Sequence, residues 1–288
     1  MSEDLYFDAT FLLFPELKKT MESVLEETGK GRGSSEAAEL ARMILTRIDN
    51  LRGDMIAASS RMSGVPVAPE MREVSEVMRY GFTALKRKLL DGEDKYHVFF
   101  NELSYETRLY KSAFTSLMSR IAEVINGMSG RIVEINDPAP LLGVKAGFRT
   151  RSEVIIVDTD ELYESDVVRE IQGDYIKKYL VKGRVVRMDE ASEYEGSVDL
   201  VIYTFIDAWR MGFDRLYAVA RRFLTSGGLL AAVVPFNMRE GLRTILRAWG
   251  VYEMAHIDDL RKKAGKYGFK DFRVRRYGLL AAITAIAK

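Results

Sequence analysis

The chain has 288 residues and a net charge of +1, from 43 basic and 42 acidic side chains. This balance gives no general electrostatic reason to expect nucleic acid or an anionic membrane as a partner. The chain has no cysteine and two histidines, which excludes disulfides, thiolate catalysis and a histidine-rich metal site, so we expect no bound metal. No apolar run is long enough to span a membrane, and the acidic N-terminus is unlike a signal peptide. We therefore expect a soluble cytoplasmic protein. Its single glutamine, beside many charged residues, is typical of a thermophile.

The first part of the chain predicts four helices, because apolar residues recur there at spacings of three and four. We expect these helices at residues 16–28, about 35–55, 71–89 and about 103–125. Glycines at 29, 31 and 33, a proline-containing loop at 63–69, and the pair Asp91-Gly92 separate them. The pattern predicts a helical domain over residues 1–129.

From residue 130 onward, short apolar segments alternate with helical ones. Strands are expected at 131–135, 153–157, 184–188, 200–203 and 229–234, with helices at about 141–149, 161–180, 209–225 and 238–248. Strands that are apolar throughout and separated by helices predict a parallel sheet covered on both faces. A helix at 257–267 and strands at 269–277 and 279–287 follow, and the single residue between these strands makes them antiparallel. We predict an α/β fold, with an N-terminal helical domain and a Rossmann-like sheet over residues 130–288.

The turn after the first strand is the first candidate for a binding site. Glu134 lies two residues before it, and Asn136 tolerates a left-handed backbone almost as well as glycine does. Asp137 follows, and then Pro138 and Pro140, whose fixed φ suits the first turn of a helix. In open α/β sheets, ligands bind beyond the carboxyl ends of the strands, where the strand order reverses.

Acidic residues also follow the next two strands. Asp158 ends the second strand and Asp189 follows the third. Each alone is equally well explained as a helix cap. Together, each after its own strand, they favour a ligand site at this edge of the sheet.

Five parallel strands followed by an antiparallel hairpin resemble the class I S-adenosylmethionine-dependent methyltransferases. The resemblance implies S-adenosylmethionine as cofactor, with Asp158 on its ribose hydroxyls and Asp189 at its adenine. The residues assigned to the cofactor are Glu134, Asn136, Asp137, Asp158, Thr159, Met188, Asp189, Tyr203 and Thr204. One feature departs from the family: Asn136, Pro138 and Pro140 stand where three glycines are usual.

The Pro-Ala-Pro-Leu-Leu sequence at 138–142 is similar to the corresponding turn of nicotianamine synthases, which also have an N-terminal helical domain. These enzymes transfer an aminocarboxypropyl group from S-adenosylmethionine, using a tyrosine and a glutamate of the helical domain. The resemblance implies catalytic roles for Tyr105, with Tyr110 as second match, and for Glu76. The leading glycines of that motif are absent here.

Either transfer is a displacement at a carbon next to a sulfonium, for which an enzyme holds the reactants in line and accepts a proton. Asp207, just past the fourth strand, is a third candidate for the proton acceptor, although a helix cap explains it equally well. We predict a transferase acting on a small molecule, by methyl or aminocarboxypropyl transfer.

Two other functions stay open. One is an RNA or protein methyltransferase, since a basic cluster lies near the C-terminus; a solvated charged face is its more common meaning. The cluster consists of Lys262, Lys263, Lys266, Lys270, Arg273, Arg275 and Arg276. The other is a catalytically decayed fold that acts as a binding or scaffold subunit, favoured if Pro138 and Pro140 block the methionine end of the cofactor site. The sequence leaves a homodimer open.

Overall fold

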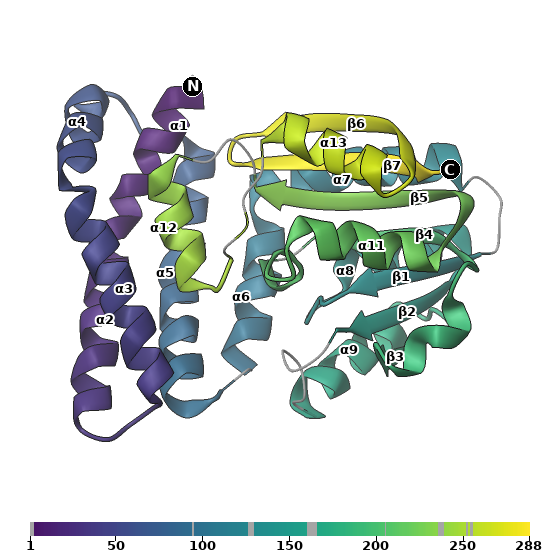
Figure 1. Ribbon diagram of the computed structural model, residues 1–288, viewed down its shortest axis with the longest axis horizontal. Coiled ribbons are helices and arrows are strands. Elements are labelled where there is room, and N and C mark those ends of the chain that lie inside the picture. Colours follow the sequence, from purple (N-terminus) through teal and green to yellow (C-terminus); the bar gives the residue numbers. More distant parts are fainter. Residues whose placement is uncertain are drawn as a thin grey trace. The chain divides into compact units, whose positions relative to one another are not determined.

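The computed structural model describes residues 3–93, 95–125, 130–159, 166–204, 206–235, 239–251, 253 and 256–288. The chain forms two compact units, each built from two stretches of sequence (Figure 1). The helical unit comprises Met1–Leu109 and Met238–Tyr252, and the sheet unit comprises Tyr110–Asn237 and Glu253–Lys288. The predicted linker at 126–129 and the first part of the predicted helix at 161–180 fall outside the described residues. The predicted domain boundary at residue 129 stays a prediction, because the two units are defined by their internal contacts and not by independent folding.

The helical unit packs amphipathic helices around a shared apolar core. Its elements are α1 (Glu3–Ala9), the 3-10 helix η1 (Thr10–Leu13), α2 (Phe14–Gly29), α3 (Ser35–Asn50), α4 (Arg52–Met62), α5 (Pro69–Asp91), α6 (Lys95–Glu106) and α12 (Glu240–Ala248). Helix α2 lies against α3 and α5, and α5 lies against α6. The Ser34 hydroxyl caps α3 by accepting a hydrogen bond of 3.2 Å from the Ala37 N–H. Gly92, in a left-handed conformation, ends α5 as predicted.

Two predicted helices are each broken into two. The helix expected at 35–55 breaks at Leu51, next to the poor helix formers Asn50 and Gly53. The helix expected at 103–125 breaks at Thr107, whose hydroxyl donates to the Ser104 carbonyl oxygen at 2.7 Å. Such a local side-chain bond competes with the helical pattern of backbone bonds. The prediction of four helices in this part of the chain was therefore wrong in number.

Helix α12 belongs to the helical unit, although the prediction grouped it with the sheet domain. Trp249, at its end, stacks on Phe100 of α6 with ring centroids 4.7 Å apart and an interplanar angle of 12°. Glu240 accepts a hydrogen bond of 3.2 Å from Arg47 of α3. The helical unit is thus completed by a segment from the far end of the sequence.

The sheet unit has the predicted α/β arrangement. Its strands are β1 (Arg131–Ile135), β2 (Glu153–Asp158), β3 (Gly183–Arg187), β4 (Val198–Tyr203), β5 (Leu224–Pro235), β6 (Phe269–Tyr277) and β7 (Leu280–Ala287). They form one sheet in the order β3-β2-β1-β4-β5-β7-β6. Strands β1 to β5 pair in parallel, and β7 pairs antiparallel with both β5 and β6, which confirms the predicted hairpin.

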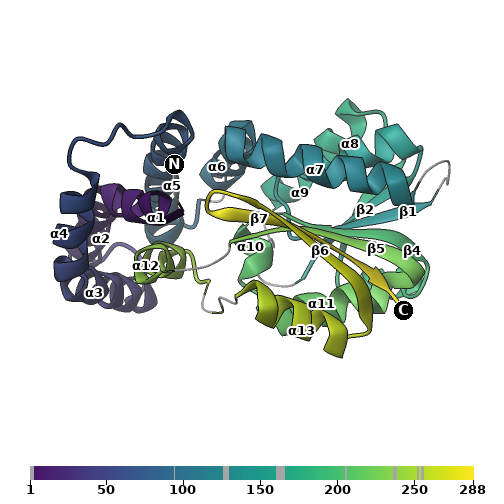
Figure 2. The same cartoon turned by 90° about the horizontal axis from the view of Figure 1, so that it is seen from above.

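Helices cover both faces of this sheet. They are α7 (Arg108–Val124, apart from its first two residues), α8 (Leu141–Thr150), α9 (Asp166–Lys178), α10 (Ile206–Trp209), α11 (Phe213–Phe223) and α13 (Ile257–Lys266), with a 3-10 helix, η3 (Glu190–Tyr194), after β3. Helices α7, α8 and α9 lie on one face, and α10, α11 and α13 lie on the other (Figure 2). Val133 and Ile135 of β1 belong to the larger core, which includes residues of α11 and α13. Within the described residues, no helix combines the length and the apolar character that crossing a membrane requires.

Candidate functional site

The strand order places the candidate site at the carboxyl ends of β1, β2 and β4. The order reverses at β1, whose neighbours are β2 and β4. After β1 the chain continues into α8 on one face of the sheet, and after β4 it continues into α10 and α11 on the other (Figure 2). Such a reversal opens a crevice between the two connections, where α/β proteins bind ligands.

The turn after β1 is anchored through its backbone. Asn136 adopts the left-handed conformation that its sequence position predicted, with φ of 50°. Its N–H donates to the Val157 carbonyl oxygen at 3.0 Å, which ties the turn to β2. Pro138 and Pro140 follow and are both buried. The glycines usual at this turn are thus replaced by residues that occupy space inside the protein.

Glu134 caps the helix that follows the turn. Its Oε2 accepts a hydrogen bond of 3.0 Å from the N–H of Gly143, in the first turn of α8. The carboxyl group is fully buried, and burial together with the nearby Asp137 carboxyl raises its pKa well above the usual range. Its other oxygen, Oε1, has no hydrogen-bond partner among the described residues.

Asp137 connects the turn to the end of β4. Its Oδ1 accepts a hydrogen bond of 2.9 Å from the Ala139 N–H, and its Oδ2 accepts one of 3.2 Å from the Thr204 hydroxyl. Asp137 and Thr204 are both fully buried. The structure therefore brings these two predicted residues together across the point where the strand order reverses.

Asn136 pairs with Thr159 at the end of β2. The Asn136 side-chain N–H donates to the Thr159 hydroxyl at 2.7 Å, and the Thr159 N–H donates to the Asn136 carbonyl oxygen at 2.8 Å. The Thr159 hydroxyl in turn donates to the sulfur of Met211 at 3.3 Å. This reciprocal pairing explains why an asparagine, rather than a glycine, occupies the left-handed position.

Asp158 is a second acid with an acceptor oxygen that no described residue uses. It is 2% exposed, and its Oδ1 accepts a hydrogen bond of 3.1 Å from the Gln172 side chain of α9. Burial raises the pKa of Asp158 to about 6, against the lowering effects of Gln172 and Arg169. Its Oδ2 is buried without a hydrogen-bond partner among the described residues. A buried carboxylate oxygen of this kind is costly unless something donates to it.

Gln172 is the residue of this site that the sequence analysis did not identify. It is fully buried, and its side-chain N–H group also donates to the Asp137 carbonyl oxygen at 3.0 Å. Its signal in the sequence is slight: it is the single glutamine of the chain. We name the set Glu134, Asn136, Asp137, Asp158, Thr159, Gln172 and Thr204 the strand-end network.

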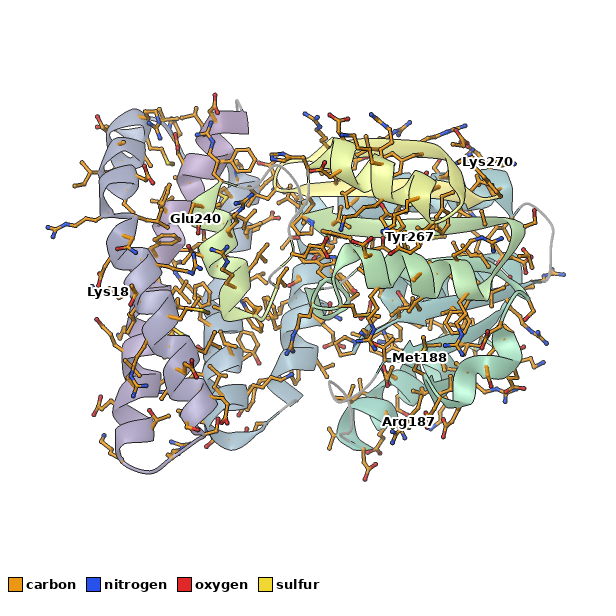
Figure 3. The ribbon with its side chains drawn as sticks, in the orientation of Figure 1. Lys18, Arg187, Met188, Glu240, Tyr267 and Lys270 are labelled. Carbon is orange, nitrogen blue, oxygen red and sulfur yellow. The ribbon has the colours of Figure 1, made fainter. Side chains whose placement is uncertain are left out.

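Three other predicted cofactor residues lie outside this network. Met188 follows β3, half-buried, and its N–H donates to the Asp158 carbonyl oxygen at 2.9 Å (Figure 3). Asp189 is exposed and lies 3.4 Å from the guanidinium of Arg187. Tyr203 is fully buried in the larger core, where burial raises the pKa of its phenol well above the usual range.

The predicted catalytic residues Tyr105, Glu76 and Asp207 are divided between the two units. Tyr105 is buried in α6 and Glu76 is exposed on α5, both in the helical unit. Asp207 lies in α10 of the sheet unit, and its side chain falls outside the described part of the structure. Their catalytic roles stay predictions.

Comparison with known proteins identifies the fold. No protein-family model matches the sequence, and no curated protein matches it. Among solved structures, the CurJ carbon methyltransferase superposes with a TM-score of 0.59 at 13% identity, covering 98% of this chain and 92% of that one. The CMeT domain of the citrinin polyketide synthase gives a TM-score of 0.60 at 12% identity, covering 100% and 89%. The DszA carbon methyltransferase gives 0.52 at 13%, covering 99% and 89%.

The fold is that of the class I methyltransferases. The likeness to the methyltransferase fold extends over nearly the whole of the chain, so the helical part of the sequence is matched as well as the sheet. Nothing in these comparisons supports the resemblance to nicotianamine synthases.

The strand-end network gives this methyltransferase fold a defined chemical character at the carboxyl ends of β1, β2 and β4. Three buried carboxyl groups, those of Glu134, Asp137 and Asp158, lie on neighbouring connections of the sheet. Two of them keep an oxygen without a partner among the described residues. Such a site favours ligand groups that donate hydrogen bonds, such as hydroxyls, and groups that carry positive charge.

Proposed function

We propose that the protein is an S-adenosylmethionine-dependent transferase that acts on a small molecule, with methyl transfer as the reaction. The observation that carries the proposal is the buried Oδ2 of Asp158 at the end of β2, to which no described residue donates a hydrogen bond. A ribose diol offers the hydroxyl donors that this oxygen lacks. The sequence-level resemblance implied this role for the same residue.

The residues of the strand-end network fit S-adenosylmethionine at its nucleoside and its cationic end. Asp158 would hold the ribose, and the Asp137 carboxyl, whose charge helps to raise the pKa of Glu134, would favour the positive charges of the sulfonium and the amino group. When bound, the cofactor supplies an electrophilic carbon next to sulfur. Under the proposal, the other residues assigned to the cofactor shape or anchor the carboxyl ends of the strands; they are Asn136, Thr159, Met188, Asp189, Tyr203 and Thr204.

Methyl transfer is favoured over aminocarboxypropyl transfer by the likeness to carbon methyltransferases along nearly the whole chain. Aminocarboxypropyl transfer, as in nicotianamine synthases, is the alternative that the turn at Pro138 and Pro140 favours. Tyr105, Glu76 and Asp207 are the proposed groups that position the acceptor or take its proton.

A second candidate function is a binding or scaffold subunit. The observation that favours it is the turn itself, whose Asn136 and Ala139 N–H groups are already bonded and whose prolines carry no N–H. This turn therefore offers few backbone donors to the carboxylate of a methionine moiety. A single titration separates the two functions.

The test is calorimetric titration with S-adenosylmethionine, S-adenosylhomocysteine and methylthioadenosine. We expect micromolar binding of the first two, and a preference for methylthioadenosine would favour aminocarboxypropyl transfer instead. Asp158→Asn should weaken binding at least about tenfold, because a charge-assisted hydrogen bond is lost. Asp174→Asn, on the exposed face of α9, is the matched control and should leave binding unchanged. If none of the three ligands binds a folded sample, the transferase function is excluded and the binding or scaffold function is left.

A further inference from the structure

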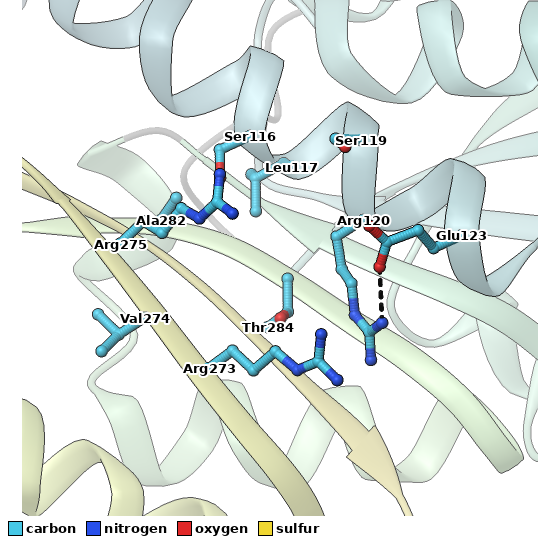
Figure 4. A pocket seen from close by; sticks show the side chains of 10 residues that line it. All are labelled: Ser116, Leu117, Ser119, Arg120, Glu123, Arg273, Val274, Arg275, Ala282 and Thr284. Carbon is cyan, nitrogen blue, oxygen red and sulfur yellow. Dashed lines mark hydrogen bonds and ion pairs between the residues drawn. The ribbon is translucent and has the colours of Figure 1, made fainter.

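A groove runs between α7 and the edge of the sheet formed by β6 and β7. Its narrow end has a cavity of about 70 Å³ lined by residues of all three elements (Figure 4). These are Ser116, Leu117, Ser119, Arg120, Glu123, Arg273, Val274, Arg275, Ala282 and Thr284. The groove lies entirely within the sheet unit, and β6 is the last strand of the sheet, three strands beyond β4. It is therefore separate from the strand-end network.

The groove widens beyond Arg275. A second hollow, of about 500 Å³, shares Ser116, Ser119 and Arg275 with the narrow end and is also lined by Lys111 and Tyr277. The narrow end alone is several times larger than the roughly 10–15 Å³ that a single water needs. The groove therefore has room for a ligand with a compact group in the narrow end and a larger part in the wide end.

The walls of the groove are rich in hydrogen-bond donors. Ser112, Thr115, Ser116 and Ser119 occupy positions i, i+3, i+4 and i+7 of a helix, so their hydroxyls share one face of α7. Opposite them, Arg273 and Arg275 are two residues apart along β6, so both side chains point to the same side of the strand. Thr284 of β7 lies between the two walls (Figure 4).

The arginines carry more donors than the local carboxylates use. Arg120 and Arg273 share one carboxylate, that of Asp271, at 2.7 Å and 3.0 Å. Arg120 also binds Glu123 at 2.9 Å, yet its Nε is buried without a partner among the described residues. The side chain of Arg275 makes no hydrogen bond or ion pair within the described part of the chain. Three guanidinium groups thus meet two carboxylates, which leaves a net positive charge in the groove.

We propose that this groove binds the phosphate group of a small phosphorylated molecule. Arginine guanidinium groups and hydroxyls are the donors that bind phosphate oxygens, and arginine matches them in a bidentate geometry. The phosphate lies in the narrow end against Arg120, Arg275 and Thr284, and the organic part of the molecule lies toward Lys111 and Tyr277. The site does not depend on the proposed cofactor.

The test is titration of the full chain with ribose 5-phosphate, with ribose as the neutral counterpart and inorganic phosphate as the minimal one. Ribose 5-phosphate should bind, inorganic phosphate more weakly, and ribose not at all. Binding should weaken as salt rises, because the groove is open to solvent. Amide chemical shifts of isotope-labelled protein should change along α7 and β6.

Three variants locate the site. Arg275→Gln should weaken binding of ribose 5-phosphate about tenfold or more, because it removes a charged donor. Thr284→Val keeps the shape of the side chain, removes the hydroxyl and should weaken binding a few-fold. Arg276→Gln is the matched control: it removes the same charge from the adjacent position, which faces the other side of β6, and should leave binding within about twofold.

Three results would overturn the proposal. The first is no binding of ribose 5-phosphate or inorganic phosphate at about 10 mM, a concentration ten times the Kd of a weak complex of about 1 mM. The second is an equal loss of binding in Arg275→Gln and Arg276→Gln, which would show diffuse surface charge. The third is tight binding of a ten-nucleotide oligouridylate that depends on Arg275 while ribose 5-phosphate does not bind, which would make the groove a nucleic-acid surface. Because S-adenosylmethionine is titrated separately, failure here leaves the proposed function untouched.

Discussion

At the scale of single residues, Asn136 combines a left-handed backbone with two side-chain hydrogen bonds to Thr159. Asn136→Ala should lower the free energy of unfolding by about 3 kcal/mol. Part of this loss arises because alanine adopts the left-handed conformation less readily than asparagine does, and part is the Thr159 N–H left buried without an acceptor. Urea denaturation measures the change.

Asn136→Gly separates these two causes. Glycine removes the same hydrogen bonds but adopts φ of 50° without strain, so it should be about 1 kcal/mol more stable than the alanine variant. If the two variants are equally stable, backbone strain contributes nothing and the hydrogen bonds account for the whole effect.

Asp158 predicts an unusual dependence of stability on pH. Its pKa is about 6 in the folded protein and 3.8 when unperturbed, so between these values the folded state holds the proton more tightly. This group therefore adds about 3 kcal/mol to the free energy of unfolding below about pH 4, and the contribution is lost as pH rises through 6. Asp158→Asn removes this contribution, and the variant should be more stable than the parent above pH 7.

Unfolding free energies measured from pH 4 to pH 8 test this, with Asp174→Asn as the exposed control. A pH profile of Asp158→Asn parallel to that of the parent protein would show that Asp158 is not the titrating group. Greater stability together with weaker S-adenosylmethionine binding would be the trade-off expected where a buried acid is kept for function.

The sequence predicted part of this site for clear physical reasons. An acid after a buried strand and an asparagine in a tight turn are local features, so Asp158 and Asn136 were identified directly. Gln172 was not, because it lies in the middle of α9 and reaches Asp158 only in the folded chain. Hydrogen bonds between distant segments leave no pattern in a single sequence.

At the scale of elements, the contact between β1 and α8 permits little change. A Cβ on Gly143 would lie 2.3 Å from Glu134 Oε2, the atom that caps the helix. Gly143→Ala should therefore lower the free energy of unfolding by about 2 kcal/mol or more, since the buried carboxyl must move and lose its hydrogen bond.

Gly173→Ala in α9 is the control for this helix substitution. Among the described residues outside the backbone of α9 itself, no atom lies within 4 Å of a Cβ placed there, so alanine should stabilise the protein by about 0.5–1 kcal/mol through helix propensity. Thermal denaturation of both variants gives the comparison. A stabilising effect of Gly143→Ala would contradict the close packing of α8 on Glu134.

Most strands were predicted closely because each is a short apolar run between turn residues, and β1 was predicted at its observed limits, Arg131–Ile135. Strand β5 is the exception: it was predicted to begin at residue 229 and begins at Leu224, ahead of its apolar run. The helices before them were predicted less well. The apolar periodicity continues through the breaks at Leu51 and Thr107, since a short break displaces the buried stripe too little to disturb the pattern. Periodicity shows that a face is buried and does not show where the backbone turns.

At the scale of the whole molecule, the sequence could not show that α12 completes the helical unit. Its apolar stripe indicates a buried face but not the partner of that face. The partner is revealed by contacts such as the stacking of Trp249 on Phe100. Helix α12 and the segments it contacts are separated by well over a hundred residues, so only the folded chain brings them together.

The chain has two tryptophans, and each unit contains one of them. Trp249 belongs to the helical unit, and Trp209 belongs to the sheet unit, where its indole N–H donates to the Val233 carbonyl oxygen at 2.7 Å. Trp249→Phe and Trp209→Phe therefore give proteins whose fluorescence reports on one unit each. Because each unit has its own buried core, we expect two distinguishable urea transitions.

S-adenosylmethionine should separate these transitions further. If the cofactor binds at the strand-end network, a concentration of about 100 times Kd should stabilise the sheet unit by about 2.7 kcal/mol. The transition reported by Trp209 should then shift to higher urea by more than the transition reported by Trp249. Equal shifts would show that the two units unfold as one cooperative body, because binding to one part of a cooperative body stabilises all of it. A shift of the Trp249 transition alone would place the cofactor on the helical unit and contradict a site at the ends of β1, β2 and β4.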